Sequence, residues 1–231
     1  MKRAVLSLPG ILILFFSLSV SAQKSKQDRQ VSYPEFNLRT SLTSFLDEDA
    51  GIMLGVNYRW SQKFSASFEP TWIFFSVFSS AGSEKIYPSG IKIRTDLRYH
   101  FPKKQRGSPD FFIAPEFHYK YTKTQIEDLF GINCQNGQCA FFQDAVYTDI
   151  KREIGGLVKM GLITPFPFID NGRWLLEFYG GLGIKRLDFR ETNLPIGGSF
   201  VSLPIRTLFG QPGSGFGLPM LPGGLKLILV L

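Results

Sequence analysis

The chain has few cysteines, few histidines and no long apolar run after its N-terminal segment. It contains two Cys and two His among 231 residues. The longest later apolar stretch, residues 71–78, is much shorter than the roughly 18 residues of a membrane-spanning helix. A zinc site usually takes four ligands, and no His lies near Cys134 or Cys139 in the sequence. We therefore expect no membrane-spanning helix, no metal site and no cofactor.

The N-terminal segment has the three parts of a secretory signal peptide. Lys2 and Arg3 precede an apolar run at residues 4–20, and small residues follow it. We predict a signal peptide at residues 1–22, followed by a short periplasmic segment at residues 23–34. Because no Cys follows the expected cleavage point, we do not expect a lipid anchor.

The remaining chain is basic and rich in aromatic residues. Removal of Lys2 and Arg3 with the signal peptide lowers the formal net charge from +7 to +5. Because an exported protein does not meet nucleic acid, we expect this charge to face lipopolysaccharide, other outer-membrane lipids or the interior of the fold. Aromatic residues make up 15% of the chain. A membrane protein that has this composition and no spanning helix has to be a closed β-barrel.

Residues 90–101 alternate between apolar and charged side chains, which is the pattern of a strand with two different faces. One face carries Ile91, Ile93, Thr95, Leu97, Tyr99 and Phe101, and the other carries Lys92, Arg94, Asp96, Arg98 and His100. Residues 52–60, 111–122 and 174–183 repeat the alternation. Strands of a membrane β-barrel follow this pattern, with apolar side chains toward lipid and polar ones toward the lumen.

Weaker alternation marks four further strands, so the chain is predicted to form eight. The four are residues 35–44, 64–75, 149–163 and 222–231. Each of the eight supplies the roughly 9 to 11 residues that a tilted membrane strand needs, and an even number is typical of single-chain outer-membrane barrels. We predict an all-β fold, an eight-stranded antiparallel up-and-down transmembrane β-barrel that comprises residues 35–231.

The predicted connections alternate between short and long. Short turns are expected at residues 61–63, 102–109 and 164–172, and long connections at residues 76–89, 124–148 and 191–221, with residues 45–49 as a short exception among the latter. Outer-membrane barrels have short periplasmic turns and longer outer loops. We therefore expect the N-terminus in the periplasm and the long loops outside, where they offer a place for an extracellular ligand.

The polar faces of the predicted strands are rich in charge. An eight-stranded barrel is just wide enough for its side chains to fill, and enclosed charges have to pair or stay hydrated, so we expect a salt-bridged network in the lumen. The residues expected to form it are Arg94, Asp96, Arg98, Glu116, His118, Lys120, Glu153 and Glu177. Further inward charges are Arg39, Arg59, Glu69, Lys92, Lys151, Lys159 and Lys185. Bases outnumber acids among them.

His118 is the one candidate general base well inside the predicted barrel, between Glu116 and Lys120 on the same face. A catalytic site also needs a nucleophile within reach of the base. The neighbouring positions on its strand offer no Ser or Asp, and the other histidine, His100, falls near the predicted periplasmic rim. We predict no catalytic residues, with an outer-membrane enzyme that acts on lipid A or peptides as an alternative.

Cys134 and Cys139 flank Asn136-Gly137, a pair typical of tight turns. We predict a disulfide bond across this turn, because the periplasm and the cell surface permit disulfides. Two free thiols are the alternative.

Three segments carry a resemblance to a known group of proteins. They are Gly55-Val56-Asn57-Tyr58-Arg59-Trp60-Ser61, Leu97-Arg98-Tyr99-His100-Phe101 and Leu221-Pro222-Gly223-Gly224-Leu225-Lys226-Leu227. The chain resembles the small outer-membrane β-barrel proteins of Bacteroidetes-type bacteria, many of them of unknown function. The resemblance implies placement in the outer membrane by the barrel-assembly machinery, and it transfers no catalytic residue.

The last residues depart from the pattern of such barrels. Outer-membrane barrels usually close with an aromatic C-terminal residue, whereas this chain ends Leu227-Ile228-Leu229-Val230-Leu231. A truncated or divergent last strand would explain the difference, and so would a secreted, soluble, lipocalin-like binding barrel, which is the second alternative.

Overall fold

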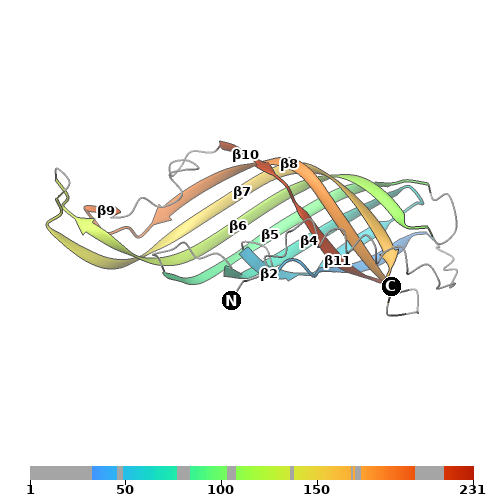
Figure 1. Ribbon diagram of the computed structural model, residues 1–231, viewed down its shortest axis with the longest axis horizontal. Coiled ribbons are helices and arrows are strands. Elements are labelled where there is room, and N and C mark those ends of the chain that lie inside the picture. Colours follow the sequence, from blue (N-terminus) through green and yellow to red (C-terminus); the bar gives the residue numbers. More distant parts are fainter. Residues whose placement is uncertain are drawn as a thin grey trace, which may run out of the picture.

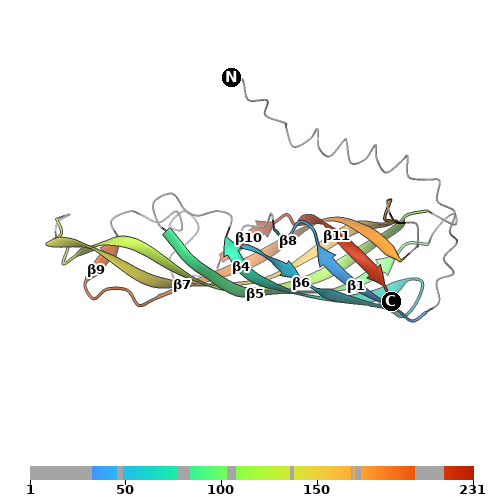
Figure 2. The same ribbon diagram turned by 90° about the horizontal axis from the view of Figure 1, so that it is seen from below.

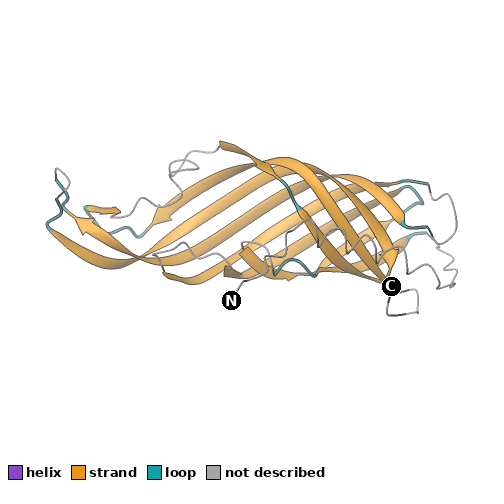
Figure 3. Ribbon diagram, in the orientation of Figure 1, coloured by secondary structure: helices purple, strands orange, loops and turns teal. Residues whose placement is uncertain are grey.

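The computed structural model describes residues 33–45, 49–76, 84–102, 108–135, 138–167, 169, 173–200 and 216–231. The predicted signal peptide, residues 23–32 and the Asn136-Gly137 pair lie outside the described residues. Within the described part every regular element is a strand, as Figure 3 shows. No helix in that part is long and apolar enough to cross a membrane.

The described residues form one antiparallel sheet of eleven strands. The strands are β1 (Glu35–Ser41), β2 (Asp49–Met53), β3 (Gly55–Arg59), β4 (Phe64–Ser76), β5 (Glu84–His100), β6 (Asp110–Ile132), β7 (Phe141–Pro165), β8 (Trp174–Thr192), β9 (Gly198–Phe200), β10 (Phe216–Met220) and β11 (Gly223–Val230). The prediction of an all-β antiparallel fold is therefore confirmed.

Hydrogen bonding joins these strands into a ring. β1 pairs with β3, and β4, β5, β6, β7 and β8 follow in sequence order, each paired with the one before it. β8 also pairs with β11, and β11 pairs with β1, where Asn37 lies opposite Val230 and Ser41 opposite Lys226. Figures 1 and 2 show the strands running obliquely along the long axis of the molecule. The ring thus leaves a continuous inside and outside.

At two positions around the ring, two short strands in succession pair with the same long neighbouring strand. β2 pairs with β4 beyond the partners of β3, and Leu54 between them still donates its N–H to the carbonyl of Pro70 at 3.2 Å. β10 pairs with β8 beyond the partners of β11 in the same way, with residues 221–222 between them. Each pair of short strands therefore follows one line along its neighbour.

The register keeps the two kinds of side chain on opposite sides of the sheet. Successive side chains of a strand point to opposite faces, and directly paired residues share a face. Arg94 lies opposite His118, and Lys120 lies opposite Glu153. All four are buried. The alternation seen in single strands thus places these charged side chains together on the inside of the ring.

β6 and β7 extend beyond the rest of the ring as a long hairpin, at the left of Figure 1. The prediction of a long loop at residues 124–148 is wrong, because strand pairing continues from Gln125↔Thr148 to Ile132↔Phe141. The expected loops at residues 76–89 and 191–221 likewise contain the start of β5, the end of β8, and β9 and β10. The strands were predicted only to the length of a membrane crossing, whereas an antiparallel ladder continues wherever its side chains pack.

Apolar packing stabilises this extension. Ile126, Phe130, Ile132 and Tyr147 form a buried cluster on one face of the hairpin, and the rings of Phe130 and Tyr147 meet edge to face at 5.7 Å. β9 adds a third strand against Phe130–Ile132. A two-stranded hairpin is marginal in water, and a third strand with an apolar face is what such a ribbon needs to be stable.

A disulfide bond joins Cys134 and Cys139 at the tip of the hairpin, which confirms the predicted pairing. Gln135 and Gln138 exchange backbone hydrogen bonds of 2.8 and 3.0 Å inside the disulfide loop. Gly131 lies beneath the two sulfur atoms, and a Cβ there would stand 2.7 Å from Cys134 Sγ and closer still to Cys139 Sγ. A residue without a side chain is therefore required at Gly131.

Candidate functional site

All eight residues predicted to form an inner network are buried. Their exposed fractions run from 0% for Glu177 to 7% for Lys120. They come from β5, β6, β7 and β8, and the strand alternation turns all of them toward the inside of the ring. Their charged groups have to be satisfied there by one another, because the interior replaces water around them.

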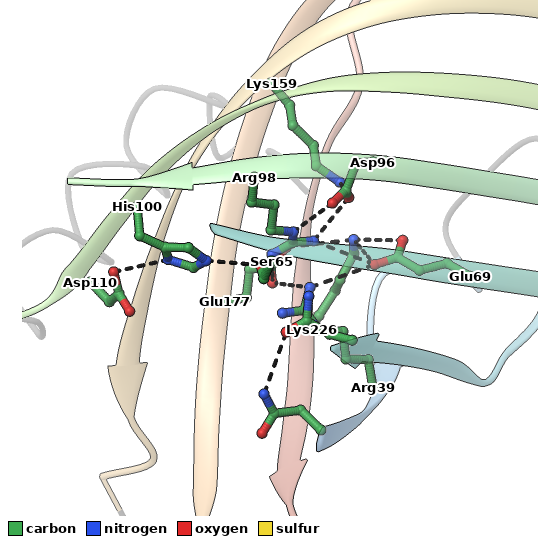
Figure 4. A network of polar contacts seen from close by, with 12 residues as sticks. Arg39, Ser65, Glu69, Asp96, Arg98, His100, Asp110, Lys159, Glu177 and Lys226 are labelled. Atoms are coloured by element: carbon green, nitrogen blue, oxygen red, sulfur yellow. Dashed lines mark hydrogen bonds and ion pairs between the residues drawn. The ribbon is translucent and has the colours of Figure 1, made fainter. Parts of the chain in front are cut away.

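Glu69 and Glu177 form the centre of the network (Figure 4). Glu177 accepts hydrogen bonds from Arg39 at 2.9 Å and from Arg98 at 2.7 Å. Glu69 accepts two hydrogen bonds from Lys226, at 2.7 and 2.8 Å. The side chains of these five residues are no more than 1% exposed. The contacts tie β1, β4, β5, β8 and β11 together across the interior.

A second group surrounds Lys159 on the β5–β6–β7 side. Asp96 lies directly opposite Glu116 in the register, an arrangement of like charges that is unfavourable by itself. Lys159 bonds both carboxylates, and its Nζ lies 2.5 Å from Glu116. Arg98 donates two further hydrogen bonds to Asp96, at 2.7 and 3.1 Å. The two cations thus hold the pair of acids in place.

Aromatic rings fill the space between these charges. The Tyr179 ring lies 4.4 Å from Lys226 Nζ, and its hydroxyl accepts a hydrogen bond from Arg94 at 3.1 Å. The Phe112 ring lies 4.4 Å from the Arg98 guanidinium. Cation–π contacts of this kind strengthen when they are removed from water. The interior is therefore packed as well as ion-paired.

A third group surrounds Glu153 on the side of the long hairpin. Lys120, Lys151 and Lys185 approach its carboxylate at 3.1, 3.0 and 3.2 Å. His118 Nε2 lies 3.6 Å from the same carboxylate. His118 therefore lies beside an ion-pair cluster in which three lysines surround one carboxylate.

Ser65, His100 and Asp110 form a hydrogen-bonded chain at the end of the ring that carries the short turns (Figure 4). Ser65 Oγ lies 2.9 Å from His100 Nε2, and His100 Nδ1 lies 3.1 Å from Asp110 Oδ1. The order is that of a catalytic triad, but a nucleophile has to reach its substrate and Ser65 is 0% exposed. Arg59 also donates to Asp110 at 2.5 Å. We interpret the chain as a polar clamp between strands.

A cavity of about 30 Å³ lies beside this clamp, which is room for about one water molecule. It is lined by Glu35, Asn37, Arg39, Asn57, Arg59, His100, Asp110, Ile163, Leu175 and Ile228. Among the described residues, no group of three or more His, Cys, Asp or Glu side chains is placed to hold a metal ion.

The outer surface carries an apolar band. On β5, β6, β7 and β8 the outward positions are uncharged over residues 91–101, 111–121, 154–164 and 174–184, a window of 11 residues on each strand. Leu97 is 60% exposed and Ile184 is 72% exposed within these windows. Large apolar side chains exposed around a whole ring are not expected on a surface that faces only water.

A row of aromatic rings follows the edge of this band at the short-turn end. The rings belong to Phe36, Tyr58, Trp60, Phe64, Tyr99 and Phe101, and successive centroids lie 4.7 to 6.4 Å apart. β1, β3, β4 and β5 carry Phe36, Tyr58, Phe64 and Tyr99, in that order. Trp60 and Phe101 are the residues directly after β3 and β5. Tyr and Trp favour the boundary between an apolar and an aqueous medium, because their rings are apolar and their tips polar.

Comparisons with known proteins add no family to these observations. No family model matches the chain, and searches of curated proteins and of solved structures return no significant match. The resemblance to small outer-membrane barrels therefore stays a prediction.

The sequence pattern missed several members of the interior groups. Lys226, Ser65 and Asp110 were not among the expected inward charges or partners, although Lys226 stands between Leu225 and Leu227 in an alternating strand. That alternation was a usable signal for Lys226. Ser65 and Asp110 lie near strand ends, and only the pairing of β4, β5 and β6 brings them to His100.

We predict that Glu177→Gln destabilises the protein by about 3 to 5 kcal/mol, because it leaves buried cations without their counter-charge. The matched control is Glu127→Gln on the exposed side of β6, where a change within about 0.5 kcal/mol is expected. Equilibrium unfolding in urea, followed by tryptophan fluorescence, measures both. Equal stability of the two variants would contradict a stabilising role for the central network.

Proposed function

We propose that this chain is a transmembrane β-barrel of the Gram-negative outer membrane, exported by its N-terminal signal peptide and inserted by the barrel-assembly machinery. Its lumen is filled by its own side chains, and its role is non-enzymatic. The barrel is a rigid scaffold that presents the β6–β7 hairpin and the neighbouring loops to ligands or partners at the cell surface. The observation that carries the proposal is the two-sided ring, apolar and exposed outside, ion-paired and buried inside.

Eight strand positions fit this proposal. β2 and β3 follow one line along β4, and β10 and β11 follow one line along β8. Counted as one interrupted strand each, they give eight positions around the ring together with β1, β4, β5, β6, β7 and β8. An eight-stranded barrel has an interior just wide enough for side chains to fill, which agrees with the small size of the cavity beside the clamp.

The width of the apolar band supports a membrane location. A tilted strand needs roughly 9 to 11 residues to cross the hydrocarbon core of a bilayer, and the uncharged outward runs on β5 to β8 are at least 11 residues long. Among the described residues, β1, β3 to β8 and β11 each pair on both sides, as the backbone of a sheet in lipid requires, whereas β2 and β10 each pair with one strand.

The two rims suggest the orientation. The aromatic row lies at the end with the short turns, and the long hairpin projects from the other end (Figure 1). Outer-membrane barrels have short turns on the periplasmic side and longer segments outside. We therefore place the short turns in the periplasm and the hairpin at the cell surface.

Leu97→Arg tests the lipid-facing surface, because Leu97 is exposed and lies near the middle of its window. In a bilayer, Arg near mid-depth is expected to destabilise the barrel by about 2 to 4 kcal/mol. The control is Ile196→Arg, at a site that is 99% exposed and lies beyond the band, where the change stays within about 0.5 kcal/mol. Urea unfolding from phosphatidylcholine vesicles measures both. Two equally small effects would contradict the proposed lipid contact.

The filled lumen predicts that the protein does not conduct ions. Purified protein inserted into a planar bilayer should give no steady single-channel current, while a known porin in the same membrane serves as the positive control. Large, steady currents from the purified protein would show that the interior is open in the membrane and would refute the filled-lumen part of the proposal.

A further inference from the structure

Four cations lie on the outer surface just beyond the apolar band, on the side of the long hairpin. They are Lys123 of β6, Arg152 of β7, and Arg186 and Arg190 of β8, and all four are exposed. Lys123, Arg152 and Arg186 are the first outward residues beyond the uncharged windows of their strands, and Arg190 lies four residues beyond Arg186. We call these four residues the cationic belt.

The strand register brings the cationic belt together. Arg152 lies opposite Asp188, so Arg186 and Arg190 are its diagonal neighbours on β8. Lys123 lies opposite Ile150, which in turn lies opposite Arg190. Diagonal neighbours on one face are about 7 to 8 Å apart, within reach of long side chains. Since adjacent strands are about 4.8 Å apart, the belt spans about 10 Å across three strands.

Few acids balance these charges locally. Asp188 shares the rows of the belt, and its carboxylate lies 3.7 Å from Arg186 Nε in an exposed pair. Exposed pairs of this kind contribute little. The next outward acids, Glu127 and Asp144, lie farther out along the hairpin. The belt therefore keeps a net positive charge, and its cations repel one another unless an anion lies between them.

We propose that the cationic belt binds the phosphate groups of lipid A, the anionic glycolipid of the outer leaflet. The inference rests on the proposed membrane location and orientation, which put the belt at the level where a headgroup meets the acyl chains. Tyr121 supports it, since the Arg152 guanidinium lies 5.8 Å from its ring at the edge of the band. Cations spread over three strands suit a headgroup with more than one phosphate better than a single phosphate.

The test uses the full mature chain, folded in neutral detergent, with native mass spectrometry to count bound lipid and give apparent Kd values. The probes are bisphosphorylated lipid A, dephosphorylated lipid A and phosphatidylglycerol. The variant is Arg152→Gln with Arg186→Gln. The matched control, Lys63→Gln with Arg173→Gln, also removes two exposed cations but at the short-turn end.

We expect the wild type and the control to bind lipid A within twofold of each other. The belt variant should bind it about 25-fold more weakly, from ~1 kcal/mol per cation near an anionic headgroup and 1.4 kcal/mol per factor of ten. Dephosphorylated lipid A and phosphatidylglycerol should bind the wild type at least tenfold more weakly than lipid A does. Because screening weakens exposed charges, the affinity of the wild type should fall as salt is added.

Three results would overturn the inference. If the belt variant and the control bound lipid A equally well, the cations of the belt would not be part of the binding site. Equal binding of lipid A with and without phosphates would leave only apolar contact, and equal binding of phosphatidylglycerol would make the site a general anionic one. Resistance of all variants to extraction from membranes by carbonate is measured alongside. If carbonate extracted the wild type, the membrane location itself would be refuted. If the wild type resisted extraction but gave any of the three results, only the lipid A site would be refuted.

Discussion

The pairing of β11 with both β8 and β1 is the constraint on which the rest of the structure depends. It joins the last strand to the first and gives every strand of the ring two neighbours. A closed sheet has no free edge in its ring, and its alternating side chains have to divide between one inside and one outside. The apolar band, the aromatic row and the buried charges are all consequences of that division.

The interior shows how a small ring accommodates so many charges. Glu69, Glu177 and Lys226 are each 0% exposed, and each contacts partners from distant parts of the sequence. Removing such charges from water is costly, and pairing offsets the cost only when the geometry is good. These ion pairs connect β1, β4, β5, β8 and β11 across the interior, and removing one partner leaves the other charge buried without its counter-charge.

Much of the fold was predictable, because a period of two within a strand is a local property. The faces of residues 90–101, the antiparallel all-β class and the Cys134–Cys139 pairing follow from short stretches of sequence. The clamp of Ser65, His100 and Asp110 does not, since it depends on a register between strands that a single sequence does not reveal. The long hairpin was missed for a related reason: its extra length depends on packing between strands, such as that of Phe130 against Tyr147, which a single sequence does not reveal.

The central claim is that the ring spans the outer membrane, and its location in cells tests this most directly. Membranes from cells that express the full chain are washed with carbonate, and the retained protein is run on a gel with and without boiling. The account predicts retention in the outer-membrane fraction and faster migration of the unboiled, folded form. Release by carbonate, together with identical migration of boiled and unboiled samples, would contradict it and favour a soluble secreted protein.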